Sequence, residues 1–163
     1  MTDERGVTYA SWSYDDHGRA ISSEHSNGAE KTNITYNPDE SVTVTNALGK
    51  ITNYKFGFFQ GIKRITSIDG EPTVNCPSSN STFIYDERGL LKSKTDSNGN
   101  ITTYTHNDRG LETSRTEASG TTDSRTITTE WHPTLSLPVR VTQPNRSIQY
   151  TYDAEGRQLT QSI

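Results

Sequence analysis

The sequence is short of the residues that build a large hydrophobic core. Only 28% of its 163 residues are hydrophobic, and Leu, Ile, Val and Phe together supply about 28 residues, roughly a sixth of the chain. So low a share is typical of disordered proteins, but disorder also requires a high net charge, and the formal charge here is only −4. Thr and Ser fill roughly a quarter of the chain, and both Thr and Tyr favour half-exposed sheet surfaces. We therefore predict an ordered, polar, all-β protein.

Other absences exclude whole classes of function. The 16 basic and 20 acidic residues are interspersed without a basic run, which argues against a nucleic-acid partner. No apolar run is long enough to cross a membrane and no signal peptide precedes Gly6, so we expect no membrane span and no targeting signal. Cys76 is the only cysteine, which excludes an internal disulfide and leaves the compartment open.

Regularly spaced turn sequences are the main feature that the chain does have. One kind is Tyr-Asp-x-x-Gly, and a second kind is rich in Asn or Asp with a late Gly. Gly supplies the positive φ that such turns need, while Asp or Asn caps the backbone two residues on. The first kind comprises Tyr14, Asp15 and Gly18; Tyr85, Asp86 and Gly89; Tyr152, Asp153 and Gly156; and a degenerate copy that Tyr104 opens before Gly110. The second kind ends at Gly28, Gly49 and Gly99.

The two kinds of turn alternate along the chain. Gly28 follows Gly18, and Gly99 follows Gly89, with about six residues of strand between the turns. This spacing predicts tandem antiparallel hairpins side by side in one curved sheet, with a period of roughly 20–21 residues. Strands are expected at 19–25, 42–46, 51–56, 90–95 and 100–105. No window shows a 3.6-residue apolar stripe, so no helix is predicted.

Two segments interrupt this period. Residues 71–82 read as a polar loop that contains proline, and residues 131–138 contain two further prolines. Because proline removes a backbone donor from a sheet, 131–138 is expected to be an edge, a bulge or an extended insert. We treat residues 1–163 as a single repeat region with irregular inserts near these two positions.

The turn motifs resemble those of the Rhs/YD-repeat proteins. The resemblance rests on three Tyr-Asp-x-x-Gly steps, on the turns that follow ten residues later and on the passage WHPTLSLPVRVTQPNRSIQYTYDAEG at 131–156. It covers nearly the whole chain, from the turn at Gly6 to Leu159. In that family, hairpins join side by side into a long sheet that spirals into a hollow shell around a C-terminal toxin segment.

The resemblance implies a structural role, secreted or at the cell surface, as part of a shell that encapsulates a toxin. The partners would be the rest of the parent Rhs polypeptide and its enclosed toxin segment. We expect the chain to be a fragment of roughly four or five hairpins. Its outer strands, near 7–14 and 157–163, would be unpaired edges that allow weak edge-to-edge self-association. The alternative function is a carbohydrate- or protein-binding module at the cell surface.

No enzyme, cofactor or metal site is predicted. The Tyr-Asp steps recur at many turns, whereas a catalytic group is needed once, so Asp15, Asp86 and Asp153 are interpreted as turn caps. The sequence DSNGN at 96–100 begins like a calcium loop but lacks the later bidentate carboxylate, which favours a hairpin turn. The four His residues have no i, i+4 pairing, and Cys76 has no identifiable base.

The aromatic residues allow two interpretations. Phe56, Phe58 and Phe59 are expected to fill a core beside the irregular loop. Trp12, Trp131 and the tyrosines could instead form a face on which sugars stack, but sheets use aromatic residues in any case.

Overall fold

The computed structural model describes residues 1–72 and 79–163, and these are almost entirely β-strand. Fourteen antiparallel strands follow one another in chain order within one sheet, as the sequence predicted. The strands are β1 Ala10–Tyr14, β2 Ala20–His25, β3 Thr32–Tyr36, β4 Val42–Thr45, β5 Ile51–Phe59, β6 Ile62–Gly70, β7 Ser81–Tyr85, β8 Leu91–Thr95, β9 Ile101–His106, β10 Glu112–Glu117, β11 Arg125–Trp131, β12 Pro138–Gln143, β13 Arg146–Tyr152 and β14 Gln158–Ser162.

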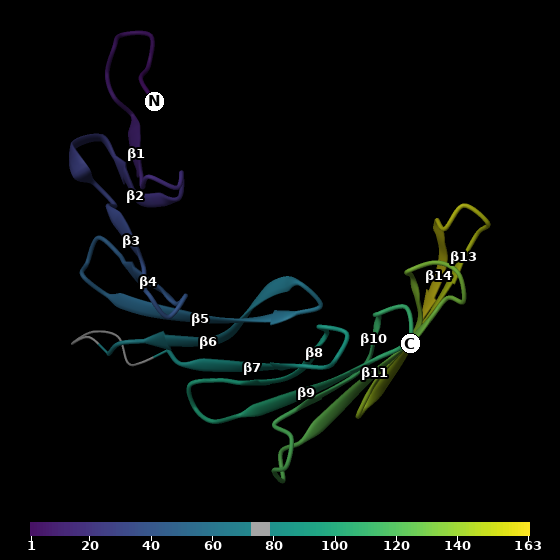
Figure 1. Ribbon diagram of the computed structural model, residues 1–163. Coiled ribbons are helices and arrows are strands. Elements are labelled where there is room, and N and C mark those ends of the chain that lie inside the picture. Colours follow the sequence, from purple (N-terminus) through teal and green to yellow (C-terminus); the bar gives the residue numbers. More distant parts are fainter. Residues whose placement is uncertain (73–78) are drawn as a thin grey trace. The chain divides into compact units, whose positions relative to one another are not determined.

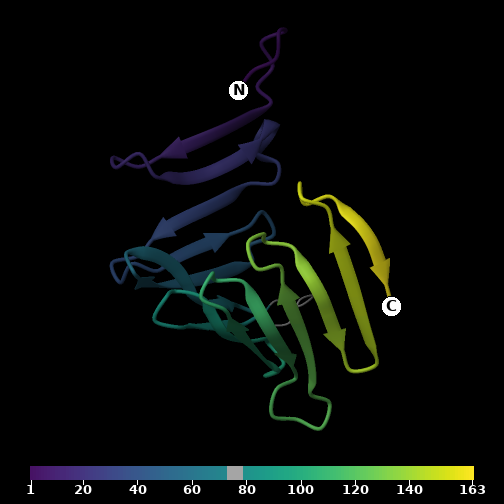
Figure 2. The same ribbon diagram turned by 90° about the vertical axis from the view of Figure 1, so that its right-hand side faces the viewer.

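The strands divide between two compact units, Met1–Thr82 and Phe83–Ile163. The first unit holds β1 to β6, the second holds β8 to β14, and β7 crosses the boundary. Within each unit, every strand lies beside its chain neighbours in one layer of hairpins (Figures 1 and 2). Each unit is therefore a meander built from local pairings.

The expected strands are confirmed, each with a shift of a few residues at most at its ends. Strands β2, β4, β8 and β9 match the predicted ranges closely, and β5 continues three residues further than expected, to Phe59. In the part of the chain that the structure describes, the single helical element is a short 3₁₀ turn at Ser26–Gly28. The same part contains no helix that is both long enough and apolar enough to span a membrane.

The number of hairpins differs from the expectation. Fourteen strands in the described residues make seven hairpins, not four or five. Several hairpins turn without either of the two motifs, so the sequence does not mark them. The hairpin of β5 and β6, for example, turns at Gln60 and Gly61 without a clamp, by which we mean an Asp or Asn side chain that accepts hydrogen bonds from backbone N–H groups of its turn.

The two predicted inserts have different outcomes. Of the first, 71–82, residues 73–78 lie outside the described part of the chain, and Ser81 and Thr82 already belong to β7. The second is a loop of residues 132–137 between β11 and β12. Pro138 is the first residue of β12 and lies opposite Trp131, where a missing N–H is tolerated. The assignment of 1–163 to one repeat region stays a prediction.

Very few side chains are buried. Among the described residues, the buried hydrophobic side chains are Ala10 and Ile148, with 5% and 8% of their surface exposed, and Ser41 is the one buried polar residue. A layered β domain would instead bury one face of its sheet against a second layer. Here each unit is a single layer whose two faces are both at least partly exposed.

Hydroxyl side chains explain how a face can remain exposed. In the second unit, direct pairing joins Thr105, Ser114, Thr128, Thr142 and Ser147 into one row across β9 to β13. Neighbouring hydroxyls also bond across strands, as between Thr116 and Thr126 at 2.9 Å. Cross-strand pairs of this kind stabilise a sheet without requiring a hydrophobic cover.

Candidate functional site

The turns are the most regular feature of the structure, and in seven of those described one carboxylate or amide accepts the same pair of backbone hydrogen bonds. In the turn after β1, Oδ1 of Asp15 accepts hydrogen bonds from the backbone N–H groups of His17 at 3.0 Å and Arg19 at 2.8 Å. The same pair of bonds, to the second and fourth residues on, occurs at Asp3, Asn46, Asp86, Asp96, Asn107 and Asp153. Except at Gly28, the two kinds of turn in the sequence therefore share one geometry.

A residue with positive φ completes each turn. Gly18, the fourth residue of the first such turn, has φ +74°, a conformation that costs glycine little. The other glycines at this position have φ between +74° and +81°, namely Gly6, Gly49, Gly89, Gly99, Gly110 and Gly156. Gly28 is different, because it belongs to the 3₁₀ turn Ser26–Gly28 and follows no Asp or Asn clamp.

Glu40 occupies the glycine position in the turn after β3, with φ +65°. We expect Glu40→Gly to raise the free energy of unfolding by about 0.5–1 kcal/mol, because it relieves this strained dihedral. Asp108→Gly is the matched control at a turn position without positive φ, and it should lower stability by a similar amount. Urea unfolding followed by circular dichroism measures both; an equal change in the two variants would contradict the assignment.

A β-bulge accompanies four of the turns at one edge of the units, those at 15–18, 107–110, 132–137 and 153–156. This edge, called the aromatic edge below, carries the turns at 15–18 and 37–40 in the first unit and those at 86–89, 107–110, 132–137 and 153–156 in the second. In the first hairpin, Ser13 pairs with Ser22 and Tyr14 with Ala20, so Ile21 has no opposite residue. Equivalent extra residues after later turns are Thr113, Val139 and Leu159.

Aromatic side chains connect successive hairpins along the aromatic edge. The hydroxyl of Tyr36 donates to the carbonyl of Ala20 at 3.1 Å. Trp131 Nε1 donates to the carbonyl of Glu112, and the hydroxyl of Tyr152 to that of Pro138, both at 2.7 Å. Each donor is the residue immediately before a turn. Each acceptor is the residue immediately after the previous turn at that edge, where a turn ends at the residue whose carbonyl accepts its closing backbone hydrogen bond. The aromatic residue of the motif is therefore a bridge between hairpins.

The degenerate motif is displaced from its predicted position. Tyr104 lies inside β9, and His106 is the residue that immediately precedes the clamp at Asn107. The prediction that Tyr104 opens this step was therefore wrong by two residues. Tyr85 ends β7 directly before Asp86, as the motif requires.

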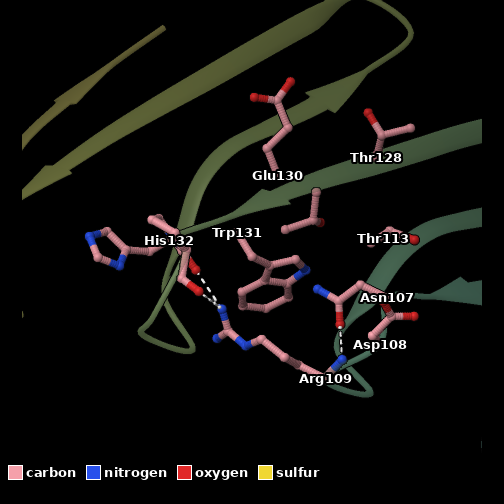
Figure 3. A pocket seen from close by; sticks show the side chains of 10 residues that line it. Asn107, Asp108, Arg109, Thr113, Thr128, Glu130, Trp131 and His132 are labelled. Atoms are coloured by element: carbon pink, nitrogen blue, oxygen red, sulfur yellow. Dashed lines mark hydrogen bonds between the residues drawn. The ribbon is translucent and has the colours of Figure 1, made fainter.

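Trp131 also lines a groove of about 680 Å³ in the second unit. Figure 3 shows the indole in the middle of the groove, between Arg109 and Asn107 on one side and Thr128 and Glu130 on the other, with the imidazole of His132 turned away. The groove is an open surface feature that Asp108 and several threonines also line. The indole N–H is already committed to the Glu112 carbonyl.

Arginine side chains reinforce the connection between turns. Arg109 donates to the carbonyls of His132, Pro133 and Leu135, each at 2.7 Å. Arg88 likewise donates to the carbonyl of Asn107 at 2.8 Å. Each arginine is the third residue of its own turn and reaches the following turn at the same edge. Charged donors of this kind make stronger hydrogen bonds than neutral ones.

The polar residues that could have formed chemical sites are placed apart. Among the described residues, no group of three or more His, Asp, Glu or Cys side chains could hold a metal ion. Asp96 clamps its turn, as the hairpin interpretation of 96–100 expected. Nδ1 of His132 accepts from the backbone N–H groups of Thr134 and Leu135 at 3.3 and 3.2 Å. Cys76 lies outside the described residues.

The phenylalanine cluster does not fill a core. Phe58 has 63% of its surface exposed. The ammonium group of Lys63 lies 4.5 Å from the ring centre of Phe56 and 6.0 Å from that of Phe58. These rings stay on the surface of the β5–β6 hairpin, because the single layer offers no second layer to cover them.

The turn clamps make stability depend on pH. The backbone N–H of Leu90 lowers the pKa of Asp86, and that of Arg157 lowers the pKa of Asp153, below the usual 3.8, because each N–H donates to the charged carboxylate. A carboxyl group with a lowered folded-state pKa contributes stability above its unfolded pKa and loses that contribution as the pH falls through the folded value. Stability should therefore be constant near neutral pH and fall below about pH 4.

Asparagine variants test this dependence. Asn46 and Asn107 already form the same clamp with a neutral side chain. Asp86→Asn and Asp153→Asn should therefore retain the turn but flatten the loss of stability in acid, measured by unfolding in urea between about pH 2.5 and pH 7. An unchanged acid profile in the double variant would show that other groups cause it.

Comparison with known proteins identifies similar repeats and similar folds. The family model described as RHS Repeat matches residues 85–122. No curated protein is similar enough in sequence to count as a match. A chain in the crystal structure of TcdB2-TccC3-Cdc42 matches 94% of this chain with a TM-score of 0.71 and 16% identity. A chain of TcdB2-TccC3-TEV matches the same share with a TM-score of 0.70 and 16% identity.

These solved chains are much longer than the present one. The chain spans 9% of the length of each of these two. A chain of the Photorhabdus luminescens Tc holotoxin pore is matched over 94% of this chain and 12% of its own length, with 12% identity and a TM-score of 0.35. At 16% identity, the first two matches show a shared fold of antiparallel hairpins.

Proposed function

We propose that the chain is a wall segment of a shell that encloses a passenger polypeptide, a toxin segment, because residues 85–122 match the family model described as RHS Repeat. The observation that carries the proposal is the exposed single layer. Among the described residues, just two hydrophobic side chains are buried, Ala10 and Ile148. A sheet with no hydrophobic face to cover can serve as a wall between two aqueous or polar compartments.

The contacts along the aromatic edge fit this role. A wall one layer thick cannot rely on a core, so adjacent hairpins must be joined within the layer. The bonds from Tyr36, Trp131 and Tyr152 to carbonyls of the preceding hairpins do this. The bonds from Arg88 and Arg109 to following turns act in the same direction.

The proposed partners are the rest of a longer RHS polypeptide and the passenger that it encloses, in a protein that is secreted or displayed at the cell surface. The similarity in fold to chains of TcdB2-TccC3 complexes, of which this chain spans 9%, supports this assignment. Carbohydrate binding, the alternative from the sequence, finds no support in the comparisons and is not proposed.

In this proposal the chain contributes structure and performs no reaction. Asp15, Asp86 and Asp153 use their carboxylates to hold backbone N–H groups of their own turns. Their Asn variants should therefore alter stability alone. A hydrolase or transferase activity of the purified chain that disappears with one of these substitutions would contradict the proposal.

Limited proteolysis of the full-length gene product tests the wall. The passenger segment should resist protease in the intact polypeptide and become sensitive when Trp131→Ala weakens the wall, whereas Trp12→Ala should leave it protected. A passenger that is equally sensitive in all three proteins would overturn the proposal, as would a gene product that contains no residues beyond these 163.

A further inference from the structure

The first hairpin contains a binding site for a tyrosine side chain. The ring of Tyr36 lies under the guanidinium group of Arg19, whose Cζ is 4.1 Å from the ring centre. The hydroxyl of the same tyrosine donates to the carbonyl of Ala20 at 3.1 Å. Nε of Arg19 is held in turn by Oδ2 of Asp15 at 2.7 Å. The Arg19 guanidinium group and the Ala20 carbonyl, called the receptor below, thus bind the tyrosine of the next hairpin.

The last hairpin repeats the parts of this receptor, with one addition, an ion pair from Arg157 to Glu155 at 3.0 Å. Nε of Arg157 donates to Oδ2 of Asp153 at 2.6 Å, and both Asp153 and Asp15 keep 20% of their side-chain surface exposed. Gly156 has φ +80°, against +74° for Gly18. Gln158 occupies the position of Ala20 after the turn, opposite Tyr152 as Ala20 is opposite Tyr14.

The neighbouring bulge is also the same. Leu159 is the extra residue after Gln158, as Ile21 is after Ala20. The arginine and the leucine of the last hairpin are, however, much more exposed than their counterparts. Arg157 has 76% of its side-chain surface exposed and Arg19 49%, while Leu159 has 64% exposed and Ile21 36%.

Tyr14 is the matching side chain at the opposite end of the strand order. It immediately precedes the Asp15 clamp, the position from which Tyr36 and Tyr152 bridge to other hairpins. It is 61% exposed, and its hydroxyl has no hydrogen-bond partner among the residues that the structure describes. Among the described residues, Tyr14 on β1 therefore bridges to no other hairpin, and no tyrosine occupies the receptor beside β14.

We propose that a second copy of this chain occupies the receptor, with its Tyr14 ring under Arg157 and its Tyr14 hydroxyl donating to the Gln158 carbonyl. β1 of one copy then lies antiparallel beside β14 of the other, in a head-to-tail contact. Such a heterologous contact uses two different surfaces, so each copy can engage two neighbours. The inference goes beyond the wall proposed above, since it concerns contacts of the isolated chain.

The structure also limits the strength of this contact. The ammonium group of Met1 donates to the carbonyl of Ala10 at 2.7 Å, and the Met1 carbonyl accepts from Tyr9 at 2.8 Å. These bonds occupy the edge of β1 at its start and leave the part near Tyr14 for a neighbour. Association should therefore be weak and depend on concentration.

Sedimentation equilibrium on complementary variants tests the proposal. The wild-type chain should associate increasingly with concentration, and both Tyr14→Ala and Arg157→Ala should weaken association about tenfold. An equimolar mixture of the two variants should form pairs and nothing larger, because one variant retains the receptor and the other retains the tyrosine. Arg140→Ala, which removes another exposed ion-paired arginine, should associate like the wild type.

Three outcomes would overturn the proposal. These are a wild-type chain that stays monomeric over the whole concentration range, single variants that associate as strongly as the wild type, and a mixture that forms no pairs although the wild type associates. Circular dichroism of each variant checks that the fold is retained, and Tyr14→Phe, which removes only the hydroxyl, gives an intermediate loss if Tyr14→Ala disturbs β1. None of these results depends on a passenger, so the wall proposal is tested separately.

Discussion

Replacing Trp131 with Ala should lower the free energy of unfolding by about 3 kcal/mol. The indole is partly buried in its groove, and complete burial would make its loss cost about 3–5 kcal/mol. Its N–H also donates to the Glu112 carbonyl at 2.7 Å, a bond that contributes about 1 kcal/mol. The loss is large for this protein because few other side chains are buried.

Trp12→Ala provides the matched control. Trp12 is the second tryptophan, lies on the edge strand β1 and is 48% exposed. Its removal should cost less than about 1 kcal/mol, as for an exposed residue without a specific contact. Each variant retains one tryptophan, so circular dichroism in urea is the appropriate measurement. Equal losses in the two variants would mean that the bridge to Glu112 adds nothing to stability.

Trp131→Phe separates the two contributions of the indole. Phenylalanine retains most of the ring surface in the groove but cannot donate to the carbonyl of Glu112. Its cost should therefore be about 1 kcal/mol, the value of the hydrogen bond alone. A cost equal to that of Trp131→Ala would assign the whole effect to the bond between hairpins.

The turns that carry a motif could be predicted from the sequence because each is specified within five residues. Asp15 and Gly18 illustrate this: the clamp bonds reach two and four residues along the chain, and the positive φ depends on one residue. Interactions between residues so close in the chain can be recognised in the sequence as a motif. The strands between the turns then follow from the spacing alone, which is why their predicted ranges lie close to those observed.

The bridges between hairpins could not be predicted in the same way. Tyr36 and Ala20 are 16 residues apart, and Trp131 and Glu112 are 19 apart. Whether they meet depends on the register of several strands and on the bulges beside some of the turns, which no single residue type encodes. A partial signal was present, because Trp131 precedes Tyr152 by one period of 21 residues. That spacing places the tryptophan at the tyrosine position of its own turn.

The loop at 132–137 shows how the bridge adapts to an irregular turn. In this loop the backbone N–H of His132 donates to the carbonyl of Leu137, which closes the loop one residue later than a regular turn. In the regular turns the N–H of Asp15 donates to the carbonyl of Arg19, and that of Asn107 to the carbonyl of Leu111. The carbonyl that accepts from the Tyr152 hydroxyl is shifted by the same one residue, to Pro138, so the bridge between the hairpins is retained. The insert that the sequence marked by its prolines is thus accommodated within the turn.

Gly110→Val should lower the free energy of unfolding by roughly 2–3 kcal/mol. Gly110 has φ +77°, a conformation in which a β-branched residue is strongly disfavoured. A Cβ atom at this position would lie 3.7 Å from Cδ2 of Leu90, an ordinary contact distance. The cost therefore comes mainly from the backbone conformation and not from a collision with that side chain.

Gly110→Asn distinguishes the conformational cost from simple bulk. Asparagine is larger than glycine but adopts the left-handed conformation far more readily than valine, so its cost should stay near 1 kcal/mol. Thermal and urea unfolding of the two variants should rank glycine first, asparagine second and valine last. Because Gly110 completes the turn from which Arg109 reaches the next loop, a disturbed turn should also weaken that bridge. Valine tolerated as well as asparagine would show that this turn does not need the left-handed residue, and that the connection through Arg109 survives without it.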